Sequence, residues 1–178
     1  MIIGILGKKG SGKDTMAEYL IQQYQFKQFT YAEPLKKICQ ELFSLTDDQV
    51  NCPHLKELVD ERWGKSPRTI LQQVGTDLFR KHYDENIWVN ILKEKIKLEP
   101  KTQNIVVSDI RHQNELDNVT QFENCLIFRI ERPNLENTDT HSTENNIFQY
   151  KDIITIKNDS TIENFHKEIQ KHLEKIID

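Results

Sequence analysis

The chain has 178 residues, of which 37% are hydrophobic and 29% charged, and its formal net charge at pH 7 is −4. This length and composition predict a single globular domain with a small insertion, and they argue against a disordered chain. The acidic balance also argues against direct binding of nucleic acid, because proteins that bind phosphate backbones usually carry a basic excess.

Short apolar runs alternate with longer amphipathic ones along the chain, a pattern typical of a parallel sheet covered by helices. Strands are predicted at 2–6, 26–31, 104–108, 126–130 and 153–156, and helices at 13–24, 34–43, 67–82, 86–97, 113–122 and 162–176. Pro34 is expected at the first helical position of its helix. Ser160, with Glu163 three residues later, is expected to cap the last helix.

Two polar segments, 44–66 and 133–150, interrupt this alternation and are expected to be surface insertions that close over a ligand. The predicted architecture is a three-layer α/β fold with a five-stranded parallel sheet in the order 2-3-1-4-5. No apolar stretch reaches the ~20 residues of a membrane span, and the N-terminal apolar run lacks the basic leader of a signal peptide. The three cysteines form no CxxC motif, which indicates a reducing compartment.

The strongest motif follows the first predicted strand and opens the first predicted helix. Residues 7–13, Gly-Lys-Lys-Gly-Ser-Gly-Lys, fit the phosphate-binding pattern G-x-x-x-x-G-K. Glycines let successive backbone N–H groups point at phosphate oxygens, and the helix N-terminus adds partial positive charge. The candidate ATP-binding residues here are Gly7, Lys9, Gly10, Ser11, Gly12, Lys13, Asp14 and Thr15. A glycine-rich turn without a ligand is the alternative.

One residue of the loop departs from the pattern. Asp14 stands where the motif has Ser or Thr, whose hydroxyl usually binds Mg²⁺. A carboxylate still suits this cation, which prefers hard oxygen ligands and keeps several waters. Asp14 is therefore a candidate Mg²⁺ ligand, directly or through water.

Five blocks spread over nearly the whole chain resemble the deoxynucleoside monophosphate kinases of phages and large DNA viruses, which are nucleotide kinases with a P-loop. These blocks are 10–15 (GSGKDT), 31–36 (YAEPLK), 66–76 (SPR, then Gln72 and Gly-Thr), 107–115 (VSDIR, then Asn-Glu) and 158–161 (NDST). Two departures are His112-Gln113, where the family often has an aromatic residue and Pro, and Ser160, where it often has Gly.

The resemblance implies Mg²⁺-assisted in-line transfer of the γ-phosphoryl group from ATP to a deoxynucleoside monophosphate, with Asn158 in the ATP site. It implies an acceptor-binding insertion at about 44–100 and a lid-like segment at about 133–150. The acceptor phosphate is already ionised at neutral pH, so no general base is required. The expected catalytic residues are Lys13, Arg111 and Arg132, the last as the arginine that a lid brings to the transferring phosphate.

The block after the third predicted strand supplies two further candidates. Asp109 ends an apolar strand, where a carboxylate can face a bound cation or the substrate; an N-cap for helix 113–122 is the alternative. Arg111 is a candidate for phosphate contact, and a salt bridge to Glu115 is the alternative.

The expected acceptor residues are Glu33, Arg68, Gln72, Gly75 and Trp88, together with Asp109 and Arg111. Arg68 opposes the helix dipole near a helix start, which points to an anionic ligand. Gln72 offers a donor and an acceptor to a base edge, and Gly75 leaves room for a ring. A plain surface helix with a packing glycine, a core role for Trp88 and helix-dipole stabilisation by Glu33 are the alternatives.

Two other functions are alternatives to a nucleoside monophosphate kinase. A GTPase switch would need D-x-x-G and N-K-x-D, which this chain lacks at the corresponding places. A P-loop kinase for phosphomevalonate or dephospho-coenzyme A is the other alternative. Both a monomer and a homodimer are compatible with the sequence, and the expected location is the cytoplasm, that of the host for a viral protein.

Overall fold

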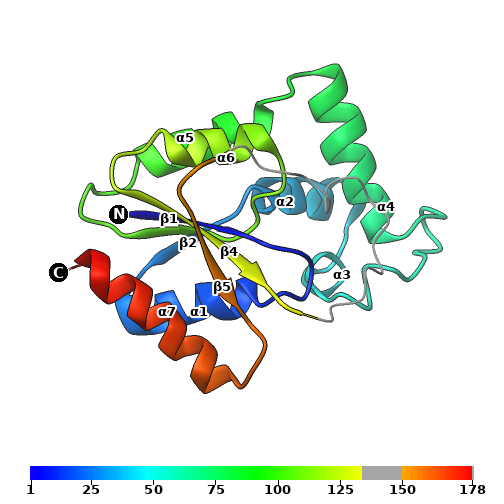
Figure 1. The fold of residues 1–178 in the computed structure, drawn as a ribbon. Helices are drawn as coiled ribbons and strands as arrows, with labels where there is room; N and C mark the ends of the chain where they lie inside the picture. The colour runs from blue at the N-terminus through cyan, green and yellow to red at the C-terminus, as the bar shows by residue number, and fades with distance from the viewer. Residues whose placement is uncertain (134–149, 178) are drawn as a thin grey trace. The chain divides into compact units, whose positions relative to one another are not determined.

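The structure, a computed structural model, describes residues 1–133 and 150–177 (Figure 1). The segment expected to form a lid falls outside the described residues except at its two ends. The chain forms two compact units: unit 1 is Met1–Thr30 with Lys97–Asp178, and unit 2 is Tyr31–Ile96. The second unit thus begins before the insertion expected at about 44–100, because it includes the helix that follows the second strand.

Unit 1 is built on one five-stranded sheet with the order β2-β3-β1-β4-β5, as the sequence predicts. The strands are β1 (Ile2–Leu6), β2 (Lys27–Phe29), β3 (Ile105–Val107), β4 (Cys125–Glu131) and β5 (Ile153–Lys157). All neighbouring strands are parallel, and Ile3 of β1 lies opposite Val106 of β3 and Leu126 of β4. The carboxyl ends of β1, β3 and β4 therefore meet at one edge of the sheet.

Helices cover both faces of this sheet. In Figure 1, α1 (Lys13–Tyr24) and α7 (Ile162–Ile177) lie on one face, and α6 (Gln113–Thr120) lies on the other. The core between the sheet, α1 and α7 consists of Ile3, Ile5, Met16, Ala17, Leu20, Phe26, Val106, Phe128, Ile130, Ile156, Phe165, Ile169 and Leu173. On the other face, a side chain at Gly4 would lie 2.7 Å from Ile127 Cδ1, so glycine permits close packing there.

One capping prediction in unit 1 is wrong by one residue. The Thr161 hydroxyl, and not that of Ser160, accepts from the backbone N–H of Asn164 at 3.3 Å. Ser160 Oγ instead accepts from the Asn164 side chain at 2.9 Å. The helix starts at Ile162, which makes Thr161 its last non-helical residue.

Unit 2 contains helices only: α2 (Ala32–Phe43), α3 (Asp47–Asn51), α4 (Pro67–Gln72), the π-helix η1 (Gln73–Arg80) and α5 (Ile87–Lys97), whose last residue belongs to unit 1. Helix α2 starts two residues before Pro34, so this proline occupies the third helical position and not the first. The helix predicted at 67–82 is an α-helical turn and a half followed by the π-helix. The core of unit 2 consists of Cys39, Leu45, Val50, Ile70 and Val74.

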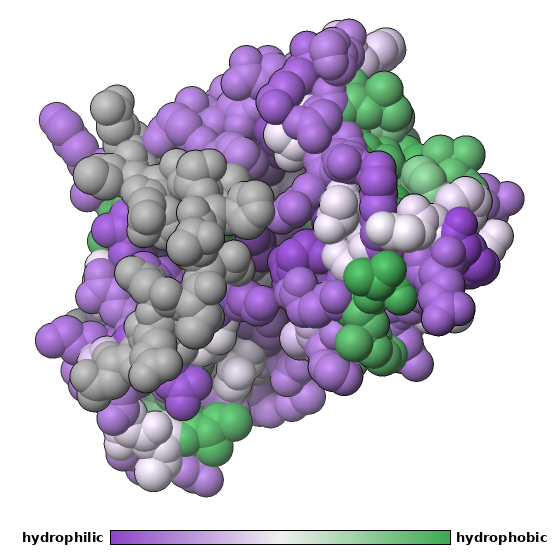
Figure 2. Space-filling view, turned by 90° about the vertical axis from the view of Figure 1, so that its right-hand side faces the viewer, coloured by the Kyte–Doolittle hydropathy of each residue, from purple (hydrophilic) through white to green (hydrophobic). Residues whose placement is uncertain are grey.

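The surface is mainly hydrophilic, in line with the composition. On the face drawn in Figure 2, apolar side chains form separate small patches. The exposed large apolar residues are Leu42, Leu58, Val59, Trp63, Leu78, Tyr83, Leu98 and Ile162. Most of them belong to unit 2, because a small unit buries a smaller share of its apolar surface. No helix within the described residues has the length and hydropathy to cross a membrane.

Candidate functional site

The loop between β1 and α1 has the backbone conformation that the phosphate-binding motif requires. Gly7, Gly10 and Gly12 have φ values of +148°, +77° and +110°. L-residues with a side chain rarely adopt this region, so glycine at these positions lets the chain curl. The curl ends directly at the N-terminus of α1, where backbone N–H groups favour an anion.

The Lys13 side chain reaches back across this loop. Its Nζ donates to the carbonyl oxygens of Gly7 at 2.6 Å and Lys8 at 2.8 Å. These contacts hold a full positive charge beside the curled backbone. The lysine is therefore placed to interact with an anion that the loop surrounds.

Ser11 provides an independent indication of a ligand. Its side chain is 1% exposed, and Oγ has no hydrogen-bond partner among the residues that the structure describes. A Cβ at Gly7 would lie 2.6 Å from this Oγ and 2.7 Å from the carbonyl oxygen of Ile130. A buried hydroxyl left without a partner is costly, and a phosphate oxygen would satisfy it. The loop thus suits a phosphate group.

Two residues that lie far from the loop in the sequence form hydrogen bonds with it. Arg132, just after β4, donates from Nη1 to the carbonyl oxygen of Gly10 at 3.3 Å. Asn158, just after β5, donates from Nδ2 to the carbonyl oxygen of Ser11 at 2.8 Å. Asn158 was expected in the ATP site and Arg132 as a catalytic arginine of the lid; the structure places both side chains against the loop, and their roles stay predictions. Lys9, Asp14 and Thr15 also lie on the loop or on the first turn of α1, with Lys9 and Asp14 exposed.

Asp14 and Asp109 are the carboxylates that the sequence suggests for a cation. Asp14 is on the first turn of α1, and Asp109 is half-buried just after β3. Within residues 1–133 and 150–177, no three His, Cys, Asp or Glu side chains gather to hold a metal ion. Mg²⁺ suits such a place, because it takes one or two carboxylates and completes its shell with phosphate oxygens and water.

The carboxylate of Glu115 holds the segment after Asp109. Glu115 is 2% exposed, and its Oε2 accepts from the backbone N–H groups of Arg111 at 2.7 Å and His112 at 3.1 Å. His112 is the N-cap of α6, so the alternative role of Asp109 as this cap is wrong. The Arg111 backbone N–H thus contributes a hydrogen bond to Glu115, and Arg111 is exposed.

In unit 2, Arg68 lies on the first turn of α4. Its Nε donates to Glu57 Oε1 at 2.5 Å, and its backbone N–H donates to the carbonyl oxygen of Lys56 at 3.0 Å. Among the residues that the structure describes, Glu57 is the one partner of the Arg68 guanidinium, and it engages the Nε edge. The terminal nitrogens offer the planar pair of donors that suits a phosphate. Gln72 is half-buried at the end of α4.

Gly75 does not leave room for a ring. A Cβ at this position would lie 2.5 Å from Leu35 Cδ2, so the space beside the glycine is filled by α2. Trp88 is 3% exposed, donates from Nε1 to the carbonyl oxygen of Gly75 at 3.0 Å and packs edge-on against Phe79. The structure favours the packing alternatives for both residues.

Glu33 lies on the first turn of α2, where a negative charge suits the helix dipole. Its carboxylate pairs with Lys37 at 2.6 Å and with Lys95 of α5 at 3.1 Å. The hydrogen bond from Lys37 is the main cause that lowers the Glu33 pKa, with Lys95 adding to it. The carboxylate therefore links α2 to α5, and its contact with a sugar hydroxyl stays a prediction.

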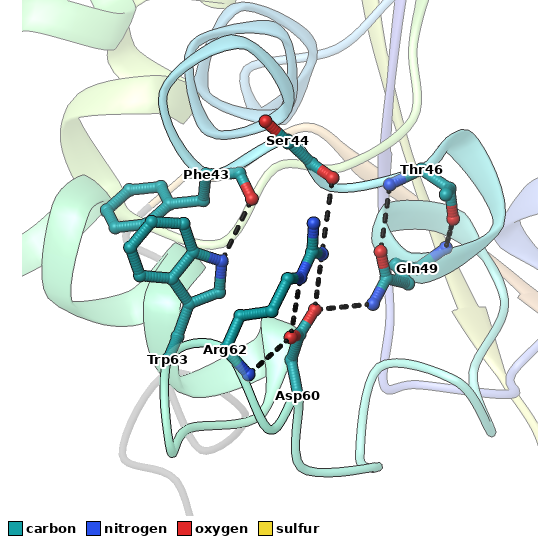
Figure 3. Close-up of polar contacts among 7 residues, drawn as sticks. All are labelled: Phe43, Ser44, Thr46, Gln49, Asp60, Arg62 and Trp63. Atoms are coloured by element: carbon teal, nitrogen blue, oxygen red, sulfur yellow. Dashed lines mark hydrogen bonds and ion pairs between the residues drawn. The ribbon is translucent and has the colours of Figure 1, made fainter.

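A group of polar contacts that sequence reasoning missed holds the loop that leads to Arg68 (Figure 3). Asp60 is at its centre: the Asp60 carboxylate accepts from Arg62 Nε at 2.9 Å, Arg62 Nη2 at 2.6 Å and Gln49 Nε2 at 3.0 Å. Arg62 also reaches the carbonyl oxygen of Ser44 at 3.3 Å, and Trp63 Nε1 donates to that of Phe43 at 2.9 Å. The loop is thus tied to the end of α2 and to α3.

We expect Asp60→Asn to lower the thermal stability of the protein at neutral pH by a few degrees. The Asp60 side chain is 6% exposed, and its hydrogen bonds with Arg62, together with the one from Gln49, lower its pKa. A lowered folded-state pKa contributes stability above the unfolded-state pKa, and that contribution is lost as the pH falls. The Tm difference between wild type and variant should therefore hold down to about pH 4 and narrow below it. An equal difference at pH 7 and pH 3 would contradict this role of the charge.

The chain is similar to known proteins in both sequence and structure. The chain matches the family described as deoxynucleotide monophosphate kinase over residues 1–61 and 54–169. It is 38% identical over 182 residues to a protein provisionally named deoxynucleotide monophosphate kinase from Acanthamoeba polyphaga mimivirus, covering 95% of this chain and 94% of the relative. The deoxynucleotide monophosphate kinase of Enterobacteria phage T4 is 26% identical over 117 residues, covering 65% of this chain and 47% of the phage protein.

Solved structures of P-loop kinases share the fold. Shikimate kinase from Aquifex aeolicus matches with a TM-score of 0.54 at 19% identity, covering 98% of this chain and 96% of the other. A sugar kinase from Janibacter matches with a TM-score of 0.54 at 12% identity, covering 97% and 94%. At these identities the likeness shows the fold, which agrees with the three-layer architecture predicted from the sequence.

Proposed function

The chain belongs to the deoxynucleotide monophosphate kinase family, and on that premise we propose that it transfers the γ-phosphoryl group of ATP to a deoxynucleoside monophosphate, with the diphosphate and ADP as products. The observation that carries the proposal is the loop of residues 7–13, which combines curled backbone, the Lys13 ammonium and the unsatisfied Ser11 hydroxyl. These are the groups that bind and orient a triphosphate.

The chemistry requires positioning and charge stabilisation, not a base. The monophosphate is already a nucleophile, so the protein has to align it with the γ-phosphorus and stabilise the charge that moves during transfer. In this proposal Lys13 follows the migrating phosphoryl group, and Arg111 and Arg132 supply further positive charge. Arg132 is suited to this part because it already contacts the loop at Gly10.

The donor site would hold Mg²⁺ through Asp14 and Asp109. When bound, the ion neutralises negative charge on the phosphate oxygens. Both carboxylates lie close in sequence to the loop or to the carboxyl end of β3, where such a ligand is expected. With two carboxylates available, phosphate and water oxygens complete the shell.

The acceptor residues expected from the sequence stay part of the proposal. Arg68 and Arg111 would contact the monophosphate, Gln72 the base and Glu33 the sugar. Arg68 supports the assignment most directly, because Glu57 engages its Nε edge and leaves the terminal nitrogens for a phosphate.

A coupled assay of ADP release with each deoxy- and ribonucleoside monophosphate, and with phosphomevalonate and dephospho-coenzyme A, tests this function. We expect Mg²⁺-dependent turnover with at least one deoxynucleoside monophosphate. Turnover only with phosphomevalonate or dephospho-coenzyme A would assign the other class of phosphorylated acceptor. ATP binding without turnover on any acceptor would favour a nucleotide-binding module and contradict the proposal.

The departure at Asp14 gives a separate expected result. If its carboxylate helps to hold Mg²⁺, Asp14→Ala raises the Mg²⁺ concentration required for half-maximal rate, because one hard oxygen ligand is lost. Asp14→Ser restores the usual hydroxyl and should keep activity. The measurement is the initial rate against free Mg²⁺ for the three proteins, with Asp117→Ala of α6 as an exposed control. Unchanged Mg²⁺ dependence in Asp14→Ala would leave Asp109 or water as the ligand.

A further inference from the structure

Asn158 is placed to control the shape of the phosphate loop. It follows β5 directly and is half-buried. Its backbone N–H donates to the carbonyl oxygen of Glu131 at 2.7 Å, which fixes the residue against the end of β4. Its side-chain amide then donates to the carbonyl oxygen of Ser11 at 2.8 Å, across 147 positions of sequence.

The contact with the loop is close as well as polar. A Cβ at Gly12 would lie 2.5 Å from Asn158 Nδ2. Gly12 also has a φ of +110°, which a residue with a side chain rarely adopts. Glycine at this position therefore serves two needs: the turn into α1 and the approach of the Asn158 amide.

Planarity of the peptide bond links this contact to the ligand. In a trans peptide the C=O and N–H groups point in opposite directions, and within residues 1–133 and 150–177 no peptide is cis. When Asn158 holds the Ser11 carbonyl on its own side, the Gly12 N–H of the same peptide faces the opposite way. Such N–H groups are the donors that a phosphate loop presents to its anion.

We propose that Asn158 is a positioning residue that sets the Ser11–Gly12 peptide for triphosphate binding and does so through the loop, not through contact with the base. This inference rests on the proposed function, since it assigns a means of donor binding to the same site. A positioning residue differs from a direct nucleoside contact in one respect: its loss weakens binding of the phosphates alone.

Inorganic tripolyphosphate separates the two roles, because it carries the phosphates without the nucleoside. We expect Asn158→Ala to weaken binding of ATP and of tripolyphosphate by the same factor, about two- to tenfold, as expected for loss of one hydrogen bond. Calorimetric titration of both ligands in the presence of Mg²⁺ measures this. Asn164→Ala is the matched control, because it removes an exposed amide that donates to Ser160 and should change neither Kd.

Asn158→Asp gives a second readout that a merely structural residue would not show. The ionised carboxylate cannot donate to the Ser11 carbonyl, but the protonated acid can. The loss of tripolyphosphate affinity relative to wild type, measured at each pH, should therefore shrink as the pH is lowered from 8 to 5. A bound anion nearby raises the pKa of the introduced acid, which brings its protonation toward this pH range. This variant serves the same test if Asn158→Ala does not fold.

Weaker ATP binding with unchanged tripolyphosphate binding would make Asn158 a nucleoside contact and overturn the inference. Unchanged binding of both ligands by the variants would also overturn it. Wild-type protein that binds neither ligand would refute the proposed function itself, which is a distinguishable failure.

Discussion

Lys13→Ala should lower kcat by roughly 10² or more, the scale on which loss of one preorganised electrostatic group slows an enzyme. The side chain carries a full charge that is held beside the loop by the carbonyl oxygens of Gly7 and Lys8. In phosphoryl transfer this charge is required most in the transition state, where negative charge moves toward the leaving oxygen. Alanine keeps the helix and removes the charge, so the fold should be preserved.

The measurement is kcat at saturating ATP and monophosphate, with Tm as the check on folding. Lys171→Ala is the matched control: its lysine lies on α7, is exposed and pairs with Glu168 at 3.6 Å. That variant should keep wild-type kcat. A Lys13→Ala protein with normal turnover would mean that the loop of residues 7–13 is not the donor site.

Elements with a long apolar pattern could be predicted from the sequence almost to the residue. The first strand and first helix were expected at 2–6 and 13–24, and the structure has them at Ile2–Leu6 and Lys13–Tyr24. The phosphate loop was predictable for the same reason, because the motif is contiguous and its two flanks have distinct periods. The sheet order, which depends on crossovers, was also confirmed.

Features that depend on distant partners could not be predicted in this way. Helix α3 is five residues long and buries only Val50, so it gives no periodic signal; its sole sequence sign was the Thr46-x-x-Gln49 capping box. Nothing in the spacing of Asp60, Arg62 and Gln49 shows that they meet. The role of Gly75 was misread because the Leu35 side chain that fills the space beside it comes from another helix.

Arg68→Lys and Arg111→Lys should each lower kcat/KM for the monophosphate by at least about tenfold, equivalent to about 1.4 kcal/mol. A guanidinium binds a phosphate through two parallel N–H groups, and a lysine ammonium cannot reproduce this geometry. The Kd for ATP without acceptor should stay within about threefold, because Lys13 and the loop backbone bind the donor. Arg80→Lys is the control in unit 2, since that arginine reaches the carbonyl oxygen of Glu85 and lies outside the proposed site.

Glu57→Gln separates a phosphate contact from a structural ion pair at Arg68. If the importance of Arg68 came from its 2.5 Å pair with Glu57, removing the Glu57 charge would reproduce the loss seen in Arg68→Lys. If the terminal nitrogens bind the acceptor, Glu57→Gln should change kcat/KM much less, because Glu57 engages only the Nε edge. Equal losses in the two variants, or weaker ATP binding with normal acceptor kinetics, would remove Arg68 from the acceptor site.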